Sequence, residues 1–169
     1  MGNIDEIDFK ILKELQKNGR ISFAEISRRT GIPDSTIYDR ISRLKEKKVI
    51  KGFTVILDDK KLGINITALV GIETKSENYG KVAKELSRID EVIEVYGVTG
   101  EFDLMVKIKA SSMEDLSRIL NVIRSMNGVD DIFVMTVLET FKEEHKVPLE
   151  KLFNLHRVLK TKKHEKYKG

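Results

Sequence analysis

A short stretch in the first third of the chain concentrates side chains that can bind phosphates and the edges of nucleic-acid bases. In a helix with Ile37 facing inward, its serine, threonine, tyrosine and arginine residues fall on or beside the outer side. Hydroxyl groups donate to phosphates, and an arginine can grip guanine with two hydrogen bonds. Lysines follow this helix, and two arginines precede it. The predicted nucleic-acid contacts are Ser35, Thr36, Tyr38, Asp39, Arg40, Ser42, Arg43, Lys47, Lys51, Arg28 and Arg29.

Two aspartates in this stretch would repel phosphates. Asp34 can cap the N-terminus of the helix. Asp39 can accept a hydrogen bond from a cytosine amine or pair with Arg43 one turn later, and we favour the pair. Trihelical bundles with basic residues also occur in protein-binding modules, so the pattern alone leaves both partners open.

The elements that position these side chains are three predicted helices. Apolar residues recur at helical spacing from Ile4 to Leu15, and Ser22 with Glu25 predicts a capping box at the start of a second helix. Gly31 ends that helix, and a third helix follows. This order is the helix-turn-helix plan, in which the last helix enters the major groove of double-stranded DNA.

The remainder of the chain changes its hydrophobic period. Residues 49–62 predict a short strand followed by a charged hinge. Alternating apolar residues then predict strands over 66–74, 92–98, 102–110 and 129–141, with helices over 79–89 and 113–126 between them. Strand-helix-strand repeated twice is the ferredoxin-like βαββαβ plan, a four-stranded antiparallel sheet with both helices on one face.

The predicted fold class is therefore α+β. An N-terminal winged-helix or helix-turn-helix domain of three helices precedes a C-terminal ferredoxin-like domain. The predicted boundaries are a DNA-binding domain over 1–52, a hinge strand and linker over 53–65, the ferredoxin-like domain over 66–145 and a basic tail over 146–169.

The face of the sheet away from the helices is too apolar for a surface in contact with water. A second copy of the chain related by a two-fold axis would cover it. A loop or the C-terminal tail is the alternative cover. The predicted dimer interface consists of Leu69, Met105, Phe133, Met135 and Val137.

Charge is distributed unevenly. Residues 1–52 hold 12 basic and 8 acidic residues, residues 53–145 hold 11 and 17, and residues 146–169 hold 8 and 2. The two ends are thus the parts suited to a polyanion, unless the basic residues only improve solubility. Two interpretations of the tail stay open: a docking helix with a basic end that contacts DNA, or a solvated segment.

Several classes of protein are disfavoured. No stretch has the roughly 18 apolar residues of a membrane helix, and no signal peptide is visible, so we expect a cytoplasmic protein with no membrane partner. There is no cysteine, the three histidines lack metal-ligand spacing, and no catalytic grouping or phosphate-binding loop is present. We expect no catalytic residues, no metal and no cofactor.

Two other classes of protein share parts of this pattern. A βαββαβ sheet also describes an RNA-binding module, but the third strand lacks the aromatic residues on which bases stack, and the domain is acidic. An enzyme or metabolic accessory protein with a sensor domain is the other class, and it lacks a catalytic cluster.

Three segments together resemble the Lrp/AsnC, or feast/famine, family of bacterial and archaeal transcription regulators. Residues 4–12 resemble its opening helix, residues 37–44 with Val49 and Ile50 its recognition helix and exit, and residues 98–105 its Gly-x-x-Asp loop and following strand. The scarcity of amide side chains and the many lysines and glutamates are typical of a thermophilic or archaeal member.

The resemblance implies that residues 66–145 form an ACT-like effector and oligomerisation domain, and that the chain is a homodimer that assembles into tetramers or octamers. It also implies an amino acid effector bound between neighbouring effector domains, where it controls assembly and promoter occupancy. Carried over by position, the effector residues are Gly97, Thr99, Gly100, Asp103 and Val134.

Departures from the family pattern leave alternatives open. Ile132 and Val134 stand where members commonly carry two threonines near the ligand, and Lys48 stands where a turn glycine is expected. The alternative function is therefore a ligand-independent architectural DNA-binding protein of the same fold. For Asp103 the alternative is a structural role in a plain hairpin turn.

Overall fold

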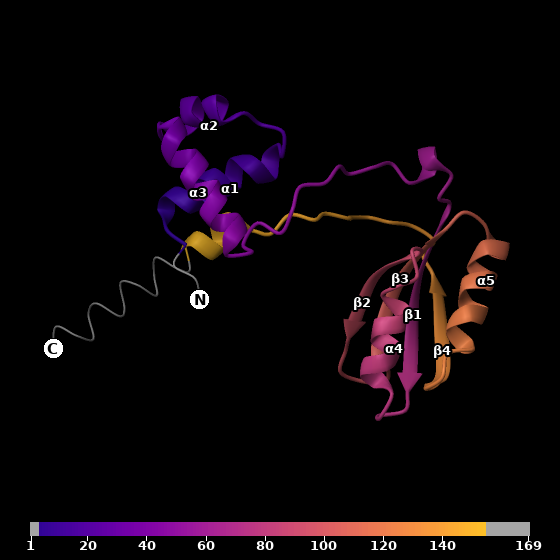
Figure 1. Cartoon of the computed structure of the whole chain (residues 1–169). Coiled ribbons are helices and arrows are strands. Elements are labelled where there is room, and N and C mark those ends of the chain that lie inside the picture. Colours follow the sequence, from indigo (N-terminus) through magenta and orange to yellow (C-terminus); the bar gives the residue numbers. More distant parts are fainter. Residues whose placement is uncertain (1–3, 155–169) are drawn as a thin grey trace. The chain divides into compact units, whose positions relative to one another are not determined.

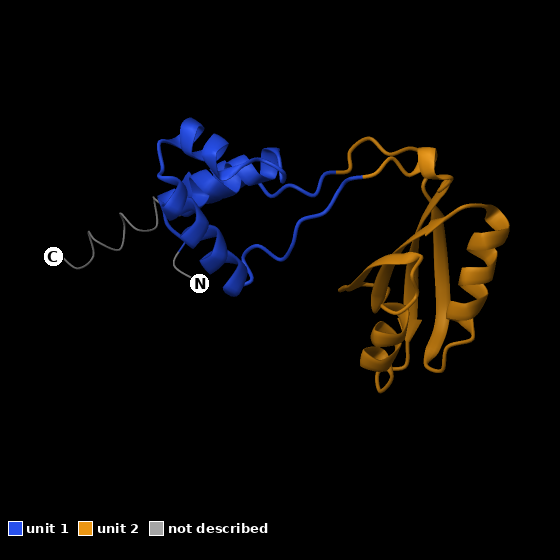
Figure 2. Ribbon diagram, turned by 45° about the horizontal axis from the view of Figure 1, so that its top comes forward, with its two compact units in different colours: residues 1–56, 144–169 blue, residues 57–143 orange. Residues whose placement is uncertain are grey.

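The computed structural model describes residues 4–154 of the chain. They form two compact units, one containing the residues up to 56 together with those from 144 onward, the other containing residues 57–143 (Figure 2). No helix among the described residues has both the length and the apolar character needed to cross a bilayer.

The first unit contains the three predicted helices, α1 (Glu6–Lys17), α2 (Phe23–Thr30) and α3 (Asp34–Glu46) (Figure 1). None is long enough to be stable alone in water, so they depend on a shared apolar core. That core consists of the buried residues Ile11, Ile26, Ile32, Ile37 and Ile41.

The residues that cap the N-termini of these helices differ from the predicted ones. Asp5 and Asp8 form a reciprocal capping box on α1, with hydrogen bonds of 3.0 and 3.1 Å. The box predicted on α2 is only half formed, because Ser22 accepts from the Glu25 amide while the Glu25 carboxylate binds arginines instead. Asp34 is the first residue of α3 rather than its cap, which is Pro33.

The end of α3 takes the shape expected of a turn glycine, although a lysine occupies the position. Lys48 has φ of 54°, in the left-handed region. The Val49 amide donates to the Leu44 carbonyl and the Lys48 amide to the Lys45 carbonyl, both at 2.9 Å. These two bonds are the Schellman pattern of a helix C-terminus.

The short strand predicted after α3 does not form. Residues 51–58 carry neither helix nor strand, and Phe53, Val55 and Leu57 are exposed. Alternating apolar residues give a strand only where a neighbouring strand accepts and donates its backbone hydrogen bonds, and none of the described residues does so here. A single 3-10 turn, η1 (Lys60–Leu62), follows this segment.

The second unit has the predicted ferredoxin-like plan, and the α+β fold class is confirmed. The sheet order is β2-β3-β1-β4, and all three neighbouring pairs are antiparallel. Its elements are β1 (Ile66–Thr74), α4 (Tyr79–Leu86), β2 (Val92–Gly97), β3 (Leu104–Ala110), α5 (Met113–Arg124) and β4 (Val129–Thr136).

Both helices of this unit cover one face of the sheet (Figure 1). Leu86 of α4 and Ile119 of α5 are buried against alternate residues of the central strands, such as Val70 and Val106. The last strand ends earlier than predicted, at Thr136. Of the apolar residues beyond it that are predicted as strand, Leu138 and Phe141 are exposed and Val137 is half-buried.

Candidate DNA-binding surface and effector loop

The N-terminal half of α3 presents several of the predicted contact residues to solvent. Ser35, Tyr38 and Asp39 are exposed, while Thr36 and Ser42 are half-buried. The Tyr38 ring meets the Phe23 ring of α2 edge-on, with ring centroids 6.1 Å apart. The Tyr38 side chain on α3 is thus oriented by the preceding helix.

The turn that separates α2 from α3 is set by Gly31. Its φ of 71° and ψ of 13° are left-handed, and its amide donates to the Ser27 carbonyl at 2.8 Å. A residue with a side chain would be strained there. This turn fixes where α3 begins relative to α2.

Arg40 and Arg43 are not free on the outer side of α3. Arg43 Nη2 donates to both carboxylate oxygens of Asp8, at 2.7 and 2.9 Å, and Arg40 binds Asp5 as well as Asp8. The predicted pair of Asp39 with Arg43 is therefore wrong. Asp8 is completely buried, and a buried carboxylate is strongly destabilising unless cations compensate its charge. An exposed ion pair one turn apart on a helix stabilises it only slightly.

The charges at this contact influence one another. Burial raises the pKa of Asp5, but the hydrogen bond from Arg40 and that from the Asp8 amide outweigh it and hold that pKa below its ordinary value. The same hydrogen bond from Arg40 to Asp5 raises the pKa of Arg40. These arginines tie α3 to the N-terminal end of α1.

Arg28 and Arg29, near the end of α2, also have acidic partners. Arg28 binds Glu25 at 2.6 Å, while Arg29 binds Glu25 at 2.6 Å and Glu14 at 3.1 Å. Lys17 completes the network on Glu14 at 2.6 Å. The Arg28 side chain is nonetheless 76% exposed, so it can still reach a phosphate.

The lysines after α3 are exposed, as expected of phosphate contacts. Lys47 and Lys51 lie on the surface, and the Lys45 ammonium sits 5.3 Å from the centre of the Phe53 ring. The structure thus brings the hydroxyls of α3 and the lysines after it into one unit, while two of the predicted arginines serve the packing of that unit.

In the second unit, the loop between β2 and β3 holds Asp103 in a structural contact. Its Oδ2 accepts hydrogen bonds from the Thr74 amide at 2.7 Å and the Thr74 hydroxyl at 3.1 Å. The β1–β4 register shifts at Glu73 and Thr74, and the Asp103 carboxylate satisfies the amide there. Asp103 is also exposed.

Gly97 at the end of β2 and Gly100 in the loop that follows have different reasons to be glycine. Gly97 lies against the Tyr79 hydroxyl, which would be 2.0 Å from an added Cβ atom. Gly100 has φ of 121° and no close neighbour, so its backbone shape is what requires glycine. Thr99 is exposed beside it, whereas Val134 packs against the core beneath the helices.

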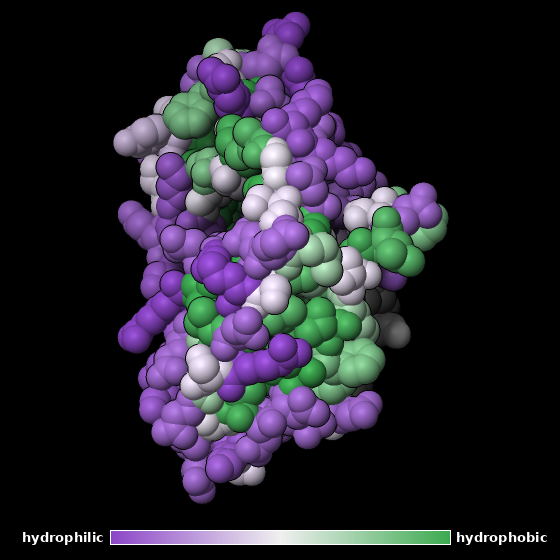
Figure 3. Space-filling view, turned by 90° about the vertical axis from the view of Figure 1, so that its right-hand side faces the viewer, coloured by the Kyte–Doolittle hydropathy of each residue, from purple (hydrophilic) through white to green (hydrophobic). Residues whose placement is uncertain are grey.

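The opposite face of the sheet exposes the apolar residues predicted for a dimer interface. Phe133 is 56% exposed, Leu69 36% and Met135 37%, while Met105 and Val137 are half-buried. Figure 3, which views the molecule from the right-hand side of Figure 1, shows hydrophobic residues gathered among hydrophilic ones.

Sequence reasoning missed the aromatic residue that shapes this face. The Phe102 ring stacks on the Phe133 ring, with centroids 5.9 Å apart and planes at 22°. It lies over Gly71, where an added Cβ atom would be 2.6 Å from the ring. A glycine inside a strand is the signal for such a close approach.

A helix-turn-helix with an exposed third helix, joined to an antiparallel sheet domain, defines a two-domain DNA-binding transcriptional regulator. Residues 4–51 match a winged helix-turn-helix DNA-binding model, and residues 67–147 match the Lrp/AsnC ligand binding domain. The chain belongs to the Lrp/AsnC family.

Curated relatives agree with this assignment. The HTH-type transcriptional regulator FL11 from Pyrococcus furiosus is 41% identical over 88% of this chain and 98% of its own length. The regulator Ptr1 from Methanocaldococcus jannaschii is 36% identical over 86% of this chain and 99% of its own. The relatives are transcriptional regulators, which confirms a regulator rather than an enzyme.

Solved structures share the fold over most of this chain. AsnC from E. coli has a TM-score of 0.78 and 28% identity over 85% of this chain and 97% of its own. The regulator NMB0573 from Neisseria meningitidis, solved with L-methionine, has a TM-score of 0.82 and 25% identity over 89% and 99%. Rv3291c from M. tuberculosis, also solved with L-methionine, has 0.80 and 26% over 85% and 98%.

Proposed function

We propose that this chain is an oligomeric, sequence-specific DNA-binding regulator whose promoter occupancy responds to an amino acid or a related metabolite. The observation that carries the proposal is the exposed N-terminal half of α3, presented by a fixed turn at Gly31. In a helix-turn-helix this is the part that reaches base edges in the major groove.

The contacts with DNA divide by chemistry. Ser35, Tyr38 and Asp39 are exposed at the start of α3 and are suited to base edges and nearby phosphates. Lys47 and Lys51 are suited to phosphates. Arg40 and Arg43, bound to Asp5 and Asp8, act mainly by holding α3 in place. Arg28, Arg29, Thr36 and Ser42 complete the proposed contact set.

Self-association follows from the outer face of the sheet. Phe133 and its stacked partner Phe102, with Leu69 and Met135, leave apolar surface in water unless another molecule covers it. A two-fold dimer covers the patch with a copy of itself and presents two α3 helices. Two recognition helices then read half-sites about 34–36 Å apart, or at multiples of that distance.

The proposed effector is an amino acid or a related small metabolite bound between neighbouring effector domains. Support comes from the family's ligand binding domain and from NMB0573 and Rv3291c, two structural neighbours solved with L-methionine. In this chain Gly100 leaves the loop backbone open to close approach, and the exposed Asp103 carboxylate can attract an ammonium group while its Oδ2 holds Thr74.

One observation favours a second function, an architectural DNA-binding protein without an effector. Val134 packs against the core, and Ile132 does the same. Neither offers the hydroxyl that a threonine would bring to a polar ligand.

The test of DNA binding is selection of bound sequences from random duplex DNA, with and without a pool of amino acids. A symmetric site is expected, and affinity should fall steeply with salt as counterions are released. Thermal shift against single amino acids separates the two functions, because a ligand at 100 times its Kd stabilises by about 2.7 kcal/mol. If no site is selected and the affinity does not change with salt, both the effector-controlled regulator and the architectural DNA-binding protein are excluded.

A further inference from the structure

The chain passes between its two compact units twice, once after α3 and again after β4 (Figure 2). We call the second crossing, residues 143–154, the strap. Two domains joined by a single linker are expected to move relative to each other. A second connection restricts that motion when both of its ends are held, and each end of the strap has contacts within its own unit.

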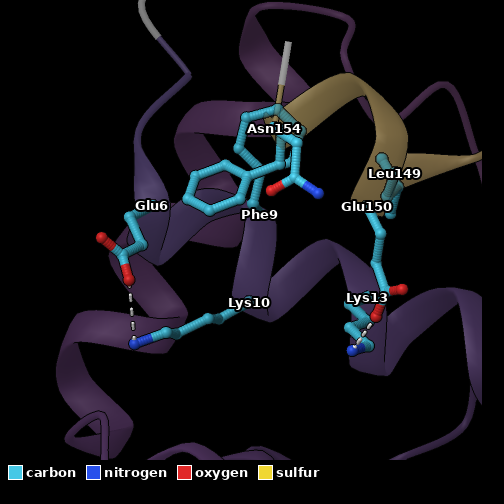
Figure 4. Close-up of a pocket in the computed structure, with 8 residues that line it drawn as sticks. Glu6, Phe9, Lys10, Lys13, Leu149, Glu150 and Asn154 are labelled. Atoms are coloured by element: carbon cyan, nitrogen blue, oxygen red, sulfur yellow. Dashed lines mark hydrogen bonds and ion pairs between the residues drawn. The ribbon is translucent and has the colours of Figure 1, made fainter. Parts of the chain in front are cut away.

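The far end of the strap is held by the first helix of the DNA-binding unit. Residues 149–154 are helical, and the Phe153 ring lies 4.9 Å from the Phe9 ring of α1, tilted by 57°. The Glu150 carboxylate forms an ion pair with the Lys13 ammonium. Figure 4 shows Phe9, Lys13 and Glu150 at this contact.

A third contact extends the same face of α1. In the orientation that satisfies both ends of its amide, Gln16 accepts from the Val147 amide at 2.8 Å and donates to the Val147 carbonyl at 3.2 Å. Phe9, Lys13 and Gln16 are four and three residues apart, so they form one stripe along α1. The strap is thus held on the helical unit from Val147 to Phe153.

The near end of the strap is held on the effector sheet. The Glu143 carboxylate forms an ion pair with the Lys107 ammonium on the outer face of β3, and Glu94 of β2 lies 3.9 Å from the same ammonium. The Lys107 side chain is only 16% exposed. The hydrogen bond between them raises the pKa of Lys107 and lowers that of Glu143, so each group favours the charged form of the other.

The first crossing is held at both ends as well. The Phe53 ring lies beside Gly19 of the helical unit, where an added Cβ atom would be 3.5 Å from it. Asp59 forms an ion pair with Lys109 of β3. Lys109 follows Lys107 by two residues in the strand, so both crossings start from the same face of the sheet.

Neither crossing has much slack between its held points. Glu143 and Val147 are four residues apart, and four residues span at most roughly 14 Å. Phe53 and Asp59 are six residues apart, which allows at most about 22 Å. While these contacts hold, the helical unit has only a limited range of movement about the two crossings.

The sheet face from which both crossings start is the face proposed to form the dimer. Lys107 is opposite Leu69 in the register of β1 and β3, and Leu69 belongs to the proposed interface. In such a dimer each copy carries its α3 helix at the end of two short crossings. The separation of the two α3 helices then depends on how little these crossings yield.

We propose that the strap makes the spacing of the two half-sites a determinant of specificity. It limits how far each α3 helix can move relative to the paired sheets, so that both helices bind only half-sites at one separation and one rotation about the duplex. This rests on the proposed function, since it requires a dimer that binds DNA through α3. The basic end of the tail, residues 155–169, lies outside the described residues.

The experiment lengthens the strap in the full chain. Eight glycine and serine residues inserted between Glu144 and His145 extend the stretch from Glu143 to Val147 from four residues to twelve. The control has the same insertion after Asn154, where it leaves both held ends in place. Each protein is titrated with three duplexes: the selected site, that site with about 5 base pairs added between its half-sites, and a single half-site. The added base pairs turn one half-site by half a turn.

The full chain and the control should bind the selected site well and lose most of that affinity when the half turn is added. The chain with the longer strap should bind the selected site about fivefold more weakly, because effective concentration falls as roughly the −3/2 power of a threefold longer linker. Adding the half turn should cost it less. All three proteins should bind the single half-site equally.

A point substitution tests the held end without changing the length. Phe153→Ala should relax the spacing preference as the insertion does, because the strap is released from α1. Leu152→Ala is the matched control, since Leu152 is 43% exposed. Thermal unfolding of both variants checks that the helical unit remains folded.

The outcomes separate the strap from the proposed function. Either a full chain that tolerates the half turn or a wild-type spacing preference in the lengthened chain or in Phe153→Ala overturns the strap and leaves the proposed function standing. Weaker binding of the lengthened chain to the single half-site overturns the strap too, because these residues would then serve the fold of the helical unit. A full chain that binds none of the duplexes overturns both.

Discussion

Asp8 on α1 is fully buried and receives two hydrogen bonds from Arg43 on α3, at 2.7 and 2.9 Å. Arg40, three residues earlier on α3, adds a bond of 3.2 Å to the same carboxylate. α3 is thus fixed to α1 by arginines whose charge would otherwise be available to bind phosphate. The pairing makes Arg43 a positioning residue.

Arg43→Ala is expected to destabilise the helical unit by about 2 kcal/mol. The buried Asp8 carboxylate would lose the positive charge and the hydrogen bonds of Arg43 and keep those of Arg40. Urea unfolding followed by circular dichroism at 222 nm measures the loss. Arg28→Ala is the matched control, since that side chain is 76% exposed and its removal should change stability little. Equal effects from the two substitutions would contradict the assignment.

Asp39 and Lys51 should respond differently when DNA binding is measured. Asp39 is exposed on α3 and no cation among the described residues pairs with it, so Asp39→Ala should change which bases are preferred at one position, by about 1–3 kcal/mol. Lys51→Ala should weaken binding to all sequences alike and reduce the salt slope by about 1 for each chain bound to the site.

Binding-site selection and salt titration of both variants measure the difference. An unchanged base preference for Asp39→Ala would remove Asp39 from the base-reading set. A sequence-dependent loss for Lys51→Ala would show that Lys51 does more than neutralise a phosphate.

The elements were predictable because their signals are local. The strands were visible from alternation and the helices from apolar spacing and glycine stops, and the observed bounds of β1, Ile66–Thr74, coincide with the prediction. The strand predicted around Phe53 failed because a strand requires a partner, and the pattern does not show whether one lies beside it.

The site was harder to predict because its key contacts are remote in sequence. Asp8 and Arg43 are 35 residues apart, and Asp103 and Thr74 are 29 apart. Helical spacing placed Arg43 on the outer side of α3 and could not reveal that it binds a buried carboxylate on another helix. The sequence leaves open whether residues 149–154 dock on the protein or stay solvated. The contact between the Phe9 and Phe153 rings shows that they dock.

Phe133→Asp should disrupt self-association through the outer face of the sheet. The side chain is 56% exposed in the single chain, so an aspartate is tolerated by the fold but would be buried uncompensated in a dimer. Size-exclusion chromatography with light scattering should show a smaller species. Val122→Asp on α5, at 45% exposure, is the control and should elute like the wild type. Equal masses for all three would argue against this interface.

Acid should weaken the helical unit through Glu14. The hydrogen bond from Lys17 lowers the pKa of Glu14 below its ordinary value of 4.5, burial opposes it, and Arg29 lowers it further. A carboxyl whose pKa is lower in the folded state binds fewer protons there than when unfolded. Its stabilisation is present above pH 4.5 and is lost as pH falls through the folded pKa.

The free energy of unfolding should therefore fall more steeply between pH 5 and pH 3 in the wild type than in Glu14→Gln. Part of the dependence should remain in the variant, because Arg28 and Arg29 lower the pKa of Glu25 as well. Denaturant unfolding across this range measures both curves. Parallel curves would show that Glu14 is not linked to stability.

Lys48→Gly should stabilise the protein, because Lys48 holds a left-handed φ of 54° at the end of α3. A side chain in that region costs about 1–2 kcal/mol, and glycine removes the cost while adding freedom to the unfolded chain, so a net gain of roughly 0.5–1 kcal/mol is expected. Lys47→Gly is the matched control, since it removes the same charge at φ of −75°, where glycine only adds unfolded-state entropy and should destabilise. Thermal and urea unfolding of the two variants should move in opposite directions. A loss of stability in both would show that the Schellman turn after Glu46 is not strained by its lysine.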